Sequence, residues 1–127
     1  MMQPCAPFAG TINITGAKTL SVTSGTFNNN TTGAIQGSGT FNPTGAAFTN
    51  NGHIKPGASP GILTITGPLP QTSSSAIDIE IGGPTVGTEY DRLNISGAAT
   101  LAGTLNISMI NNYDLQPGDS FQPGRLG

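Results

Sequence analysis

Two acidic residues, Asp78 and Glu80, stand two positions apart in the stretch Ile77–Ile81. Side chains alternate between the two faces of a strand, so both carboxylates lie on one face, which points outward if the three isoleucines point inward. Neighbours on one face of a strand are about 7 Å apart. Two carboxylates at that spacing suit Ca²⁺ binding or acid–base cleavage of a polysaccharide. The interpretation we favour is that they keep an exposed sheet face soluble.

A third acidic residue, Asp91, lies between Tyr90 and Arg92, the one cation near these acids in sequence. We expect Asp91 to cap a turn, or to pair with Arg92 or with a backbone amide at a neighbouring corner, rather than to do chemistry. We therefore assign no catalytic residue. Asp78, Glu80 and Asp91 remain as candidates for the alternative, a polysaccharide-cleaving site.

The other residues that commonly carry chemistry are scarce in this chain. There is one histidine, His53, and one cysteine, Cys5. Zinc sites usually take four ligands of these types, so we expect no metal and no cofactor. A single cysteine also leaves no intrachain disulfide.

Charge and hydropathy exclude two classes of partner. Only 8% of the 127 residues are charged, and the net charge is -2, whereas about 25% is usual for a globular domain. The four cations are scattered, so we expect no binding to the phosphates of a nucleic acid. No apolar run approaches the roughly 20 residues that span a membrane.

A short alternating motif recurs in place of helical periodicity. It places two apolar residues two positions apart around a small polar residue, and Ser or Thr follows. Such alternation predicts short strands with one buried face. The motif occurs at Ile12–Gly16, Leu20–Thr23, Leu63–Gly67, Leu93–Gly97 and Leu105–Ser108, and with acidic outward positions at Ile77–Ile81.

A longer repeat joins these strands. The segments Phe27–Gly37 and Phe48–Gly57 share a Phe, an Asn pair, a Gly, an Ile and a closing Gly. Self-similarity at about 20 residues is typical of repeat architectures in which each unit buries its face on its neighbours. Glycine and Pro-Gly corners between short strands point the same way.

We therefore predict an all-β fold for the single domain 1–127: a right-handed parallel β-helix, or β-solenoid. The alternative is a β-sandwich or jelly roll built from antiparallel hairpins. Residues 1–10 and 114–127 are expected to be end segments, and the chain to be a fragment of a larger protein.

Stacked repeats would also align polar side chains. Asn28 to Asn30 and Asn50-Asn51 are candidates for asparagine ladders along the axis, although turn residues of this type are equally expected. Outward positions in the strand motifs would form an array of hydroxyls and amides. Such an array can order water, so an ice-binding surface is a further alternative. The array would comprise Asn13, Thr15, Ser21, Thr23, Thr64, Thr66, Asn94, Ser96, Asn106 and Ser108.

Several stretches resemble the repeat region of large bacterial surface proteins. They are NNGHIKPGASPGILTITG, AIDIEIGG, GTEYDRLNISGAATLAGTLNIS and GDSF. The pattern is similar to that of autotransporter-passenger and filamentous-haemagglutinin-like proteins, and it covers roughly Phe27 to Phe121. The resemblance implies a right-handed parallel β-helix outside the cell, acting as a stalk. The family usually continues after GDSF with another strand, whereas QPGRLG follows here.

These observations together predict a structural or adhesive module that is extracellular or on a bacterial cell surface, without catalysis of its own. The alternative is a carbohydrate-active or carbohydrate-binding β-helix. Expected partners are a glycan or host-surface ligand, and a second copy bound through exposed solenoid ends. The predicted core comprises Ile12, Ile14, Leu20, Val22, Phe27, Ile35, Phe41, Phe48, Ile54, Leu63, Ile65, Ile77, Ile79, Ile81, Leu93, Ile95, Leu101, Leu105 and Ile107.

Overall fold

The computed structural model describes residues 9–57 and 60–126. This part of the chain forms short strands joined by turns and contains no helix, so the predicted all-β class is confirmed. It accordingly has no helix long and apolar enough to cross a membrane. Cys5 and most of the predicted end segment 1–10 lie outside the described residues.

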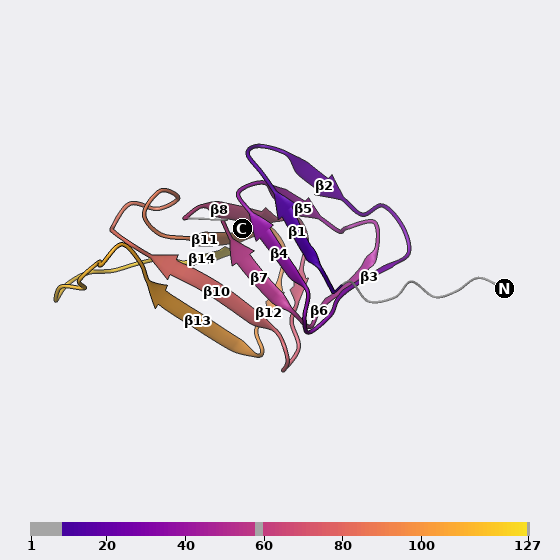
Figure 1. The fold of residues 1–127 in the computed structure, drawn as a ribbon. Coiled ribbons are helices and arrows are strands. Elements are labelled where there is room, and N and C mark those ends of the chain that lie inside the picture. The colour runs from indigo at the N-terminus through magenta and orange to yellow at the C-terminus, as the bar shows by residue number, and fades with distance from the viewer. Residues whose placement is uncertain (1–8, 58–59, 127) are drawn as a thin grey trace.

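The first of two five-stranded sheets is all parallel, and its strands lie side by side across Figure 1. In sheet order they are β1 (Thr11–Ile14), β4 (Ala34–Gly37), β7 (His53–Pro56), β10 (Ala76–Ile81) and β13 (Thr104–Met109).

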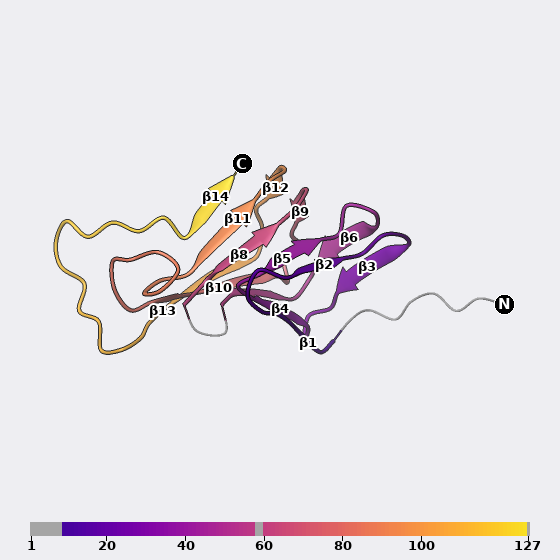
Figure 2. The same cartoon turned by 90° about the horizontal axis from the view of Figure 1, so that it is seen from above.

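The second five-stranded sheet runs along the other side of the molecule and is visible from above in Figure 2. Its strands, also parallel, are β2 (Thr19–Ser21), β5 (Thr40–Asn42), β8 (Ile62–Ile65), β11 (Arg92–Ile95) and β14 (Gly124–Leu126).

The remaining strands form two parallel pairs. They are β3 (Thr26–Asn29) with β6 (Ala47–Asn50), and β9 (Leu69–Pro70) with β12 (Ala99–Thr100). A parallel bridge between Asn50 and Gln71 links the two pairs.

Every third strand therefore returns to the same sheet, and each group of three successive strands is one repeating unit. Every ladder between the named strands is parallel, which is compatible with a β-solenoid. The antiparallel hairpins of a sandwich or jelly roll are absent from these ladders. Phe27 pairs with Phe48, and Ile35 pairs with Ile54, so the repeat found in the sequence is a structural repeat.

The inward side chains stack from unit to unit. In the first sheet, the register joins Ile12, Ile35, Ile54, Ile77 and Leu105 into one row, which we call the isoleucine row. Aliphatic residues with a branched Cβ pack well against identical neighbours on a pleated surface. This stacking explains why period-two alternation in the sequence predicts the core.

Most of the predicted core is confirmed. Buried members are Ile14, Ile35, Phe41, Ile54, Leu63, Ile65, Ile79, Ile81, Leu93 and Ile95. Five predicted residues are half-buried and pack against the buried clusters: Ile12, Val22, Phe27, Phe48 and Ile77. Three of the phenylalanine rings, those of Phe27, Phe41 and Phe48, pack against one another with centroids 5.3–6.0 Å apart.

The prediction was wrong for Leu20, Leu101, Leu105 and Ile107, which are exposed. Leu20 lies in the first unit, and the other three lie in the last units described. Leu20 lies on β2, Leu105 and Ile107 lie on β13, and Leu101 directly follows β12. Within the described residues these three strands pair on one side only, so no described strand covers the second side of these side chains.

Some corners require glycine. Gly37, at the end of β4, has φ +114, and a Cβ there would strike the carbonyl oxygen of Ile14 in the preceding unit. A left-handed backbone with a neighbouring strand this close admits only a residue without a side chain.

The predicted end segment 114–127 contains a strand. Within 114–126, residues Gly124–Leu126 form β14 and pair with β11. The loop that precedes it places Phe121 against Tyr90, with ring centroids 5.2 Å apart.

Candidate functional site

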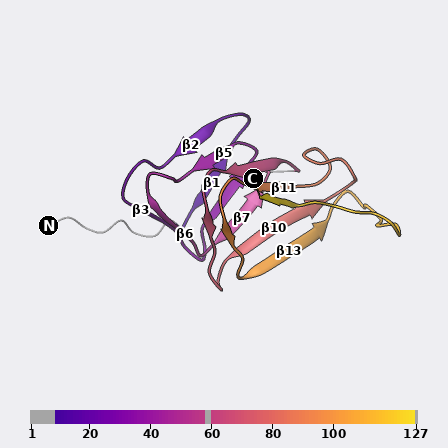
Figure 3. The ribbon, with the colours of Figure 1, turned by 180° about the vertical axis from the view of Figure 1, so that it is seen from behind.

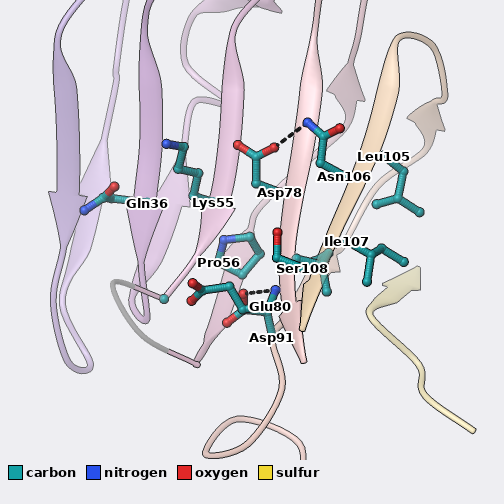
Figure 4. Close-up of a pocket in the computed structure, with 12 residues that line it drawn as sticks. Gln36, Lys55, Pro56, Asp78, Glu80, Asp91, Leu105, Asn106, Ile107 and Ser108 are labelled. Atoms are coloured by element: carbon teal, nitrogen blue, oxygen red, sulfur yellow. Dashed lines mark hydrogen bonds between the residues drawn. The ribbon is translucent and has the colours of Figure 1, made fainter. Parts of the chain in front are cut away.

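The outer face of the first sheet carries a groove of about 750 Å³. Figure 4 shows polar side chains from β4, β7, β10 and β13 along it. They are Gln36, Lys55, Asp78, Glu80, Asn106 and Ser108, and Asp91, which directly precedes β11, also lines the groove. The three acidic candidates from the sequence are therefore brought together in one groove.

Asp78 is held by two neighbours. His53 Nδ1 lies 2.7 Å from Asp78 Oδ2, and Asn106 Nδ2 donates to Asp78 Oδ1 at 2.8 Å. These partners come from β7 and β13, on either side of β10. The sequence shows no acid close to His53. The pairing of His53 with Asp78 can be identified only from the strand register, which sets His53 opposite Ala76 and therefore diagonal to Asp78.

Asp91 is 1% exposed and binds two backbone amides. Gly61 N donates to its Oδ1 at 2.9 Å, and Glu80 N donates to its Oδ2 at 2.7 Å. The sequence analysis expected Asp91 to cap a turn, to pair with Arg92 or to bind a backbone amide at a neighbouring corner. The bond from Gly61 N is of the last kind. Desolvation outweighs these bonds and raises the pKa of Asp91 from 3.8 to about 6. Its carboxylate joins the turn before β8 to strand β10, which is a structural role.

The raised pKa of Asp91 predicts how stability depends on pH. The folded state holds this proton more tightly than the unfolded state, so the free energy of unfolding rises as pH falls from above 6 towards 3.8. The whole change is roughly 2–3 kcal/mol. Urea denaturation of the native chain and of Asp91→Asn at several pH values in this range gives the free energy of unfolding of each. The contribution of Asp91 is the difference between their pH dependences.

Asp91→Asn should lose the part of the pH dependence described above. Equal slopes for the native chain and for Asp91→Asn would contradict the assignment to Asp91.

The cation in the groove is not the one that the sequence suggested. Arg92 is the first residue of β11, in the second sheet, and its side chain binds Gln122. Its Nε donates to Gln122 O at 3.0 Å and its Nη2 donates to Gln122 Oε1 at 3.3 Å. Lys55 lines the groove instead. It comes from β7, 23 positions before Asp78 in sequence, so linear proximity could not have identified it.

Buried amides form a ladder along the axis, which is one of the two roles expected for the asparagine pairs. Asn29 Nδ2 donates to Asn50 Oδ1 at 2.8 Å, and Asn50 Nδ2 donates to Gln71 Oε1 at 2.9 Å. Gln71 Nε2 then donates to Ala102 O at 3.3 Å. We call this set the inner ladder. Gln71 is the member that the sequence analysis missed, because its side chain is longer than those of the repeat.

A second, outer ladder is half-buried. Asn51 Nδ2 donates to Asn28 Oδ1, and Thr72 Oγ1 donates to Asn51 Oδ1, each at 2.6 Å. Adjacent asparagines thus serve two parallel ladders, one facing inward and one facing outward.

Outward hydroxyls of the second sheet also align. Thr19, Thr40 and Thr64 are successive partners across β2, β5 and β8, and Asn94 follows on β11. Of the ten residues of the predicted array, only Thr64 and Asn94 belong to this row, and Asn13 and Asn106 lie in the first sheet instead.

Within the described residues, no group of three or more His, Cys, Asp or Glu side chains is placed to hold a metal ion. No protein-family model, curated protein sequence or solved structure matches this chain.

Proposed function

We propose that the chain is a segment of a right-handed parallel β-helix that acts as a structural or adhesive module of a secreted or surface-anchored bacterial protein. The observation that carries this proposal is the stacking of like on like along the axis, in the isoleucine row and in the inner ladder. The handedness follows from the strong preference for right-handed connections between parallel strands of one sheet.

Such a construction supports an extended, stiff element. Each unit contacts its neighbours alone, so length is gained by adding units, and the outward faces form long surfaces. The extracellular location is supported by the resemblance of the repeat stretches to surface-protein repeats.

Two of the three acidic candidates in the groove, Asp78 and Asp91, support a non-catalytic role. Both oxygens of Asp91 accept backbone amides, and both oxygens of Asp78 have side-chain partners. A general acid or nucleophile must instead present a free oxygen to the substrate.

We expect no cleavage of neutral or acidic polysaccharides, with or without Ca²⁺. Product release should match that of the double variant Asp78→Asn, Glu80→Gln. The measurement is of reducing ends and of unsaturated sugar products. Turnover that this double variant abolishes would overturn the proposal in favour of a carbohydrate-active β-helix.

Carbohydrate binding without cleavage is the second candidate function. The groove favours it because amides, a hydroxyl and Lys55 face one surface. Titration of the chain with neutral and acidic oligosaccharides, followed by amide chemical shifts, tests it. Shifts confined to the strands of the groove, and weakened by Lys55→Ala or Ser108→Ala, would support binding there.

The ice-binding alternative rests on the row of Thr19, Thr40 and Thr64. A thermal-hysteresis measurement on the chain decides it. Hysteresis that Thr40→Tyr removes would replace the stalk proposal with an ice-binding one.

A further inference from the structure

The groove on the first sheet opens where two of its strands separate. Figure 3 shows β7, β10 and β13 side by side in this order. The ladder between β7 and β10 joins two residue pairs, His53 with Ala76 and Ile54 with Ile77, whereas the β4–β7 ladder joins four pairs and the β10–β13 ladder six. Strand β7 ends at Pro56, which has no N–H to donate to a neighbouring strand. The two strands therefore pair at their starts, and the groove lies between their ends.

Asp91 closes the floor of this groove. Glu80 N donates to Asp91 Oδ2 at 2.7 Å, and Asp91 N donates to Glu80 O at 3.0 Å, so Asp91 takes the place of a partner strand here. Strands β7 and β10 each have a described strand on both sides, so the groove belongs to the middle of the sheet. Its volume of about 750 Å³ lies within the range of roughly 300–1,000 Å³ that is usual for small-molecule sites.

One positive and one negative side chain in the groove have no partner. Asp78 has two side-chain partners, and Asp91 has two backbone amides. Within 9–57 and 60–126, neither Lys55 Nζ nor the Glu80 carboxylate forms a hydrogen bond or an ion pair. Figure 4 shows that these two side chains extend from neighbouring strands without meeting. A cation and an acceptor, placed apart, are therefore left to bind a ligand.

We propose that the groove binds a hexuronic acid residue of an acidic polysaccharide, with the sugar carboxylate on Lys55 and the sugar hydroxyls on Glu80 and Ser108. The ring of such a sugar carries its carboxylate on one edge and neighbouring hydroxyls on the opposite edge. This matches the separation of the two unpaired charges, and hydrogen bonds with an ionised partner are roughly twice as strong as neutral ones. The inference rests on the carbohydrate-binding role proposed above and names its ligand.

Other sugar classes fit these groups less well. A neutral sugar leaves Lys55 without an anionic partner. An amino sugar brings a second positive charge close to Lys55, and like charges held together in a binding site lower affinity. Affinity should therefore follow the charge of the sugar, with the acidic sugar first.

The test uses three sets of identically linked oligomers of equal length, built from glucuronic acid, glucose or glucosamine. Their rings have the same configuration and differ in charge. Each is titrated into the full 127-residue chain, with affinity measured by calorimetry and the site located by amide chemical shifts. We expect shifts in β7 and β10, binding of the glucuronic acid oligomer at least about 5-fold tighter than that of the glucose oligomer, and the weakest binding for glucosamine.

Substitution of the two unpaired side chains assigns the contacts. Lys55→Gln keeps a long polar side chain and should reduce the affinity for the glucuronic acid oligomer to that for glucose, while leaving glucose binding unchanged. Lys18→Gln, at an exposed lysine outside the groove, changes the net charge equally and should keep the preference. Glu80→Gln should weaken binding of the glucose oligomer, because its hydroxyls lose an ionised acceptor.

Three results would overturn the inference: equal affinity for the three oligomers, tighter binding of glucosamine, or a preference for glucuronic acid that survives Lys55→Gln. Binding of none of them would overturn it together with the carbohydrate-binding candidate. That result would leave the structural module in place, because the stacked core is tested separately by the unfolding of Ile54→Ala.

Discussion

Replacing Ile54 with alanine should lower the free energy of unfolding by about 3–5 kcal/mol. Ile54 is fully buried on β7, in the middle of the isoleucine row, between Ile35 and Ile77. The neighbouring strands are hydrogen-bonded on both sides, so they cannot close the cavity that the lost atoms leave. Urea denaturation followed by circular dichroism measures the loss.

Two further variants make this prediction specific. Ile54→Val removes one methylene group and should cost about 0.5–1.5 kcal/mol. Leu105→Ala lies at the exposed end of the same row and should cost less than about 1 kcal/mol. Equal losses for Ile54→Ala and Leu105→Ala would contradict the stacked core.

Replacing Asn50 with alanine should be about as damaging, at roughly 3–5 kcal/mol. All four hydrogen-bonding positions of this buried amide are used. Its Oδ1 accepts from Asn29 and from Gly52 N, and its Nδ2 donates to Gln71 and to Gly52 O. Alanine would remove this amide and leave all of its hydrogen-bond partners unpaired, at a buried position where water cannot replace it.

The neighbouring residue supplies the matched control for the inner ladder. Asn51 makes two side-chain bonds in the outer ladder but is half-buried. Asn51→Ala should therefore cost only about 1 kcal/mol, because solvent reaches the groups it leaves. Gln71→Ala should fall between the two. Thermal and urea unfolding of the three variants measure the order, and a larger loss at Asn51 than at Asn50 would refute the inner ladder.

The two ladders show how far a local pattern reaches. The asparagine pairs and their repeat at about 20 residues predict that amides stack. The pattern does not say which asparagine of each pair turns inward, because alternation assigns faces only once the strand register is known. The structure turns Asn29 and Asn50 inward and Asn28 and Asn51 outward.

The candidate site was predictable in its acids but not in their partners. Asp78 and Glu80 share a face because of strand periodicity alone. His53, Lys55 and Asn106 join them through strands that are distant in sequence. Contacts of this kind depend on the length of each intervening loop, which sets the register and which composition does not encode.

The amino-acid sequence by itself determined the all-β class, the short strands, the repeat and most of the buried aliphatic residues, because these follow from local alternation and from glycine and proline at the corners. Tertiary structure alone decided which strands are neighbours, that Asp91 binds two distant amides, and that Leu105 and Ile107 are left uncovered. The physical reason is that burial of an inward side chain in a stacked fold requires a unit on each side of it. A residue's own neighbours in sequence cannot reveal whether that second unit is present.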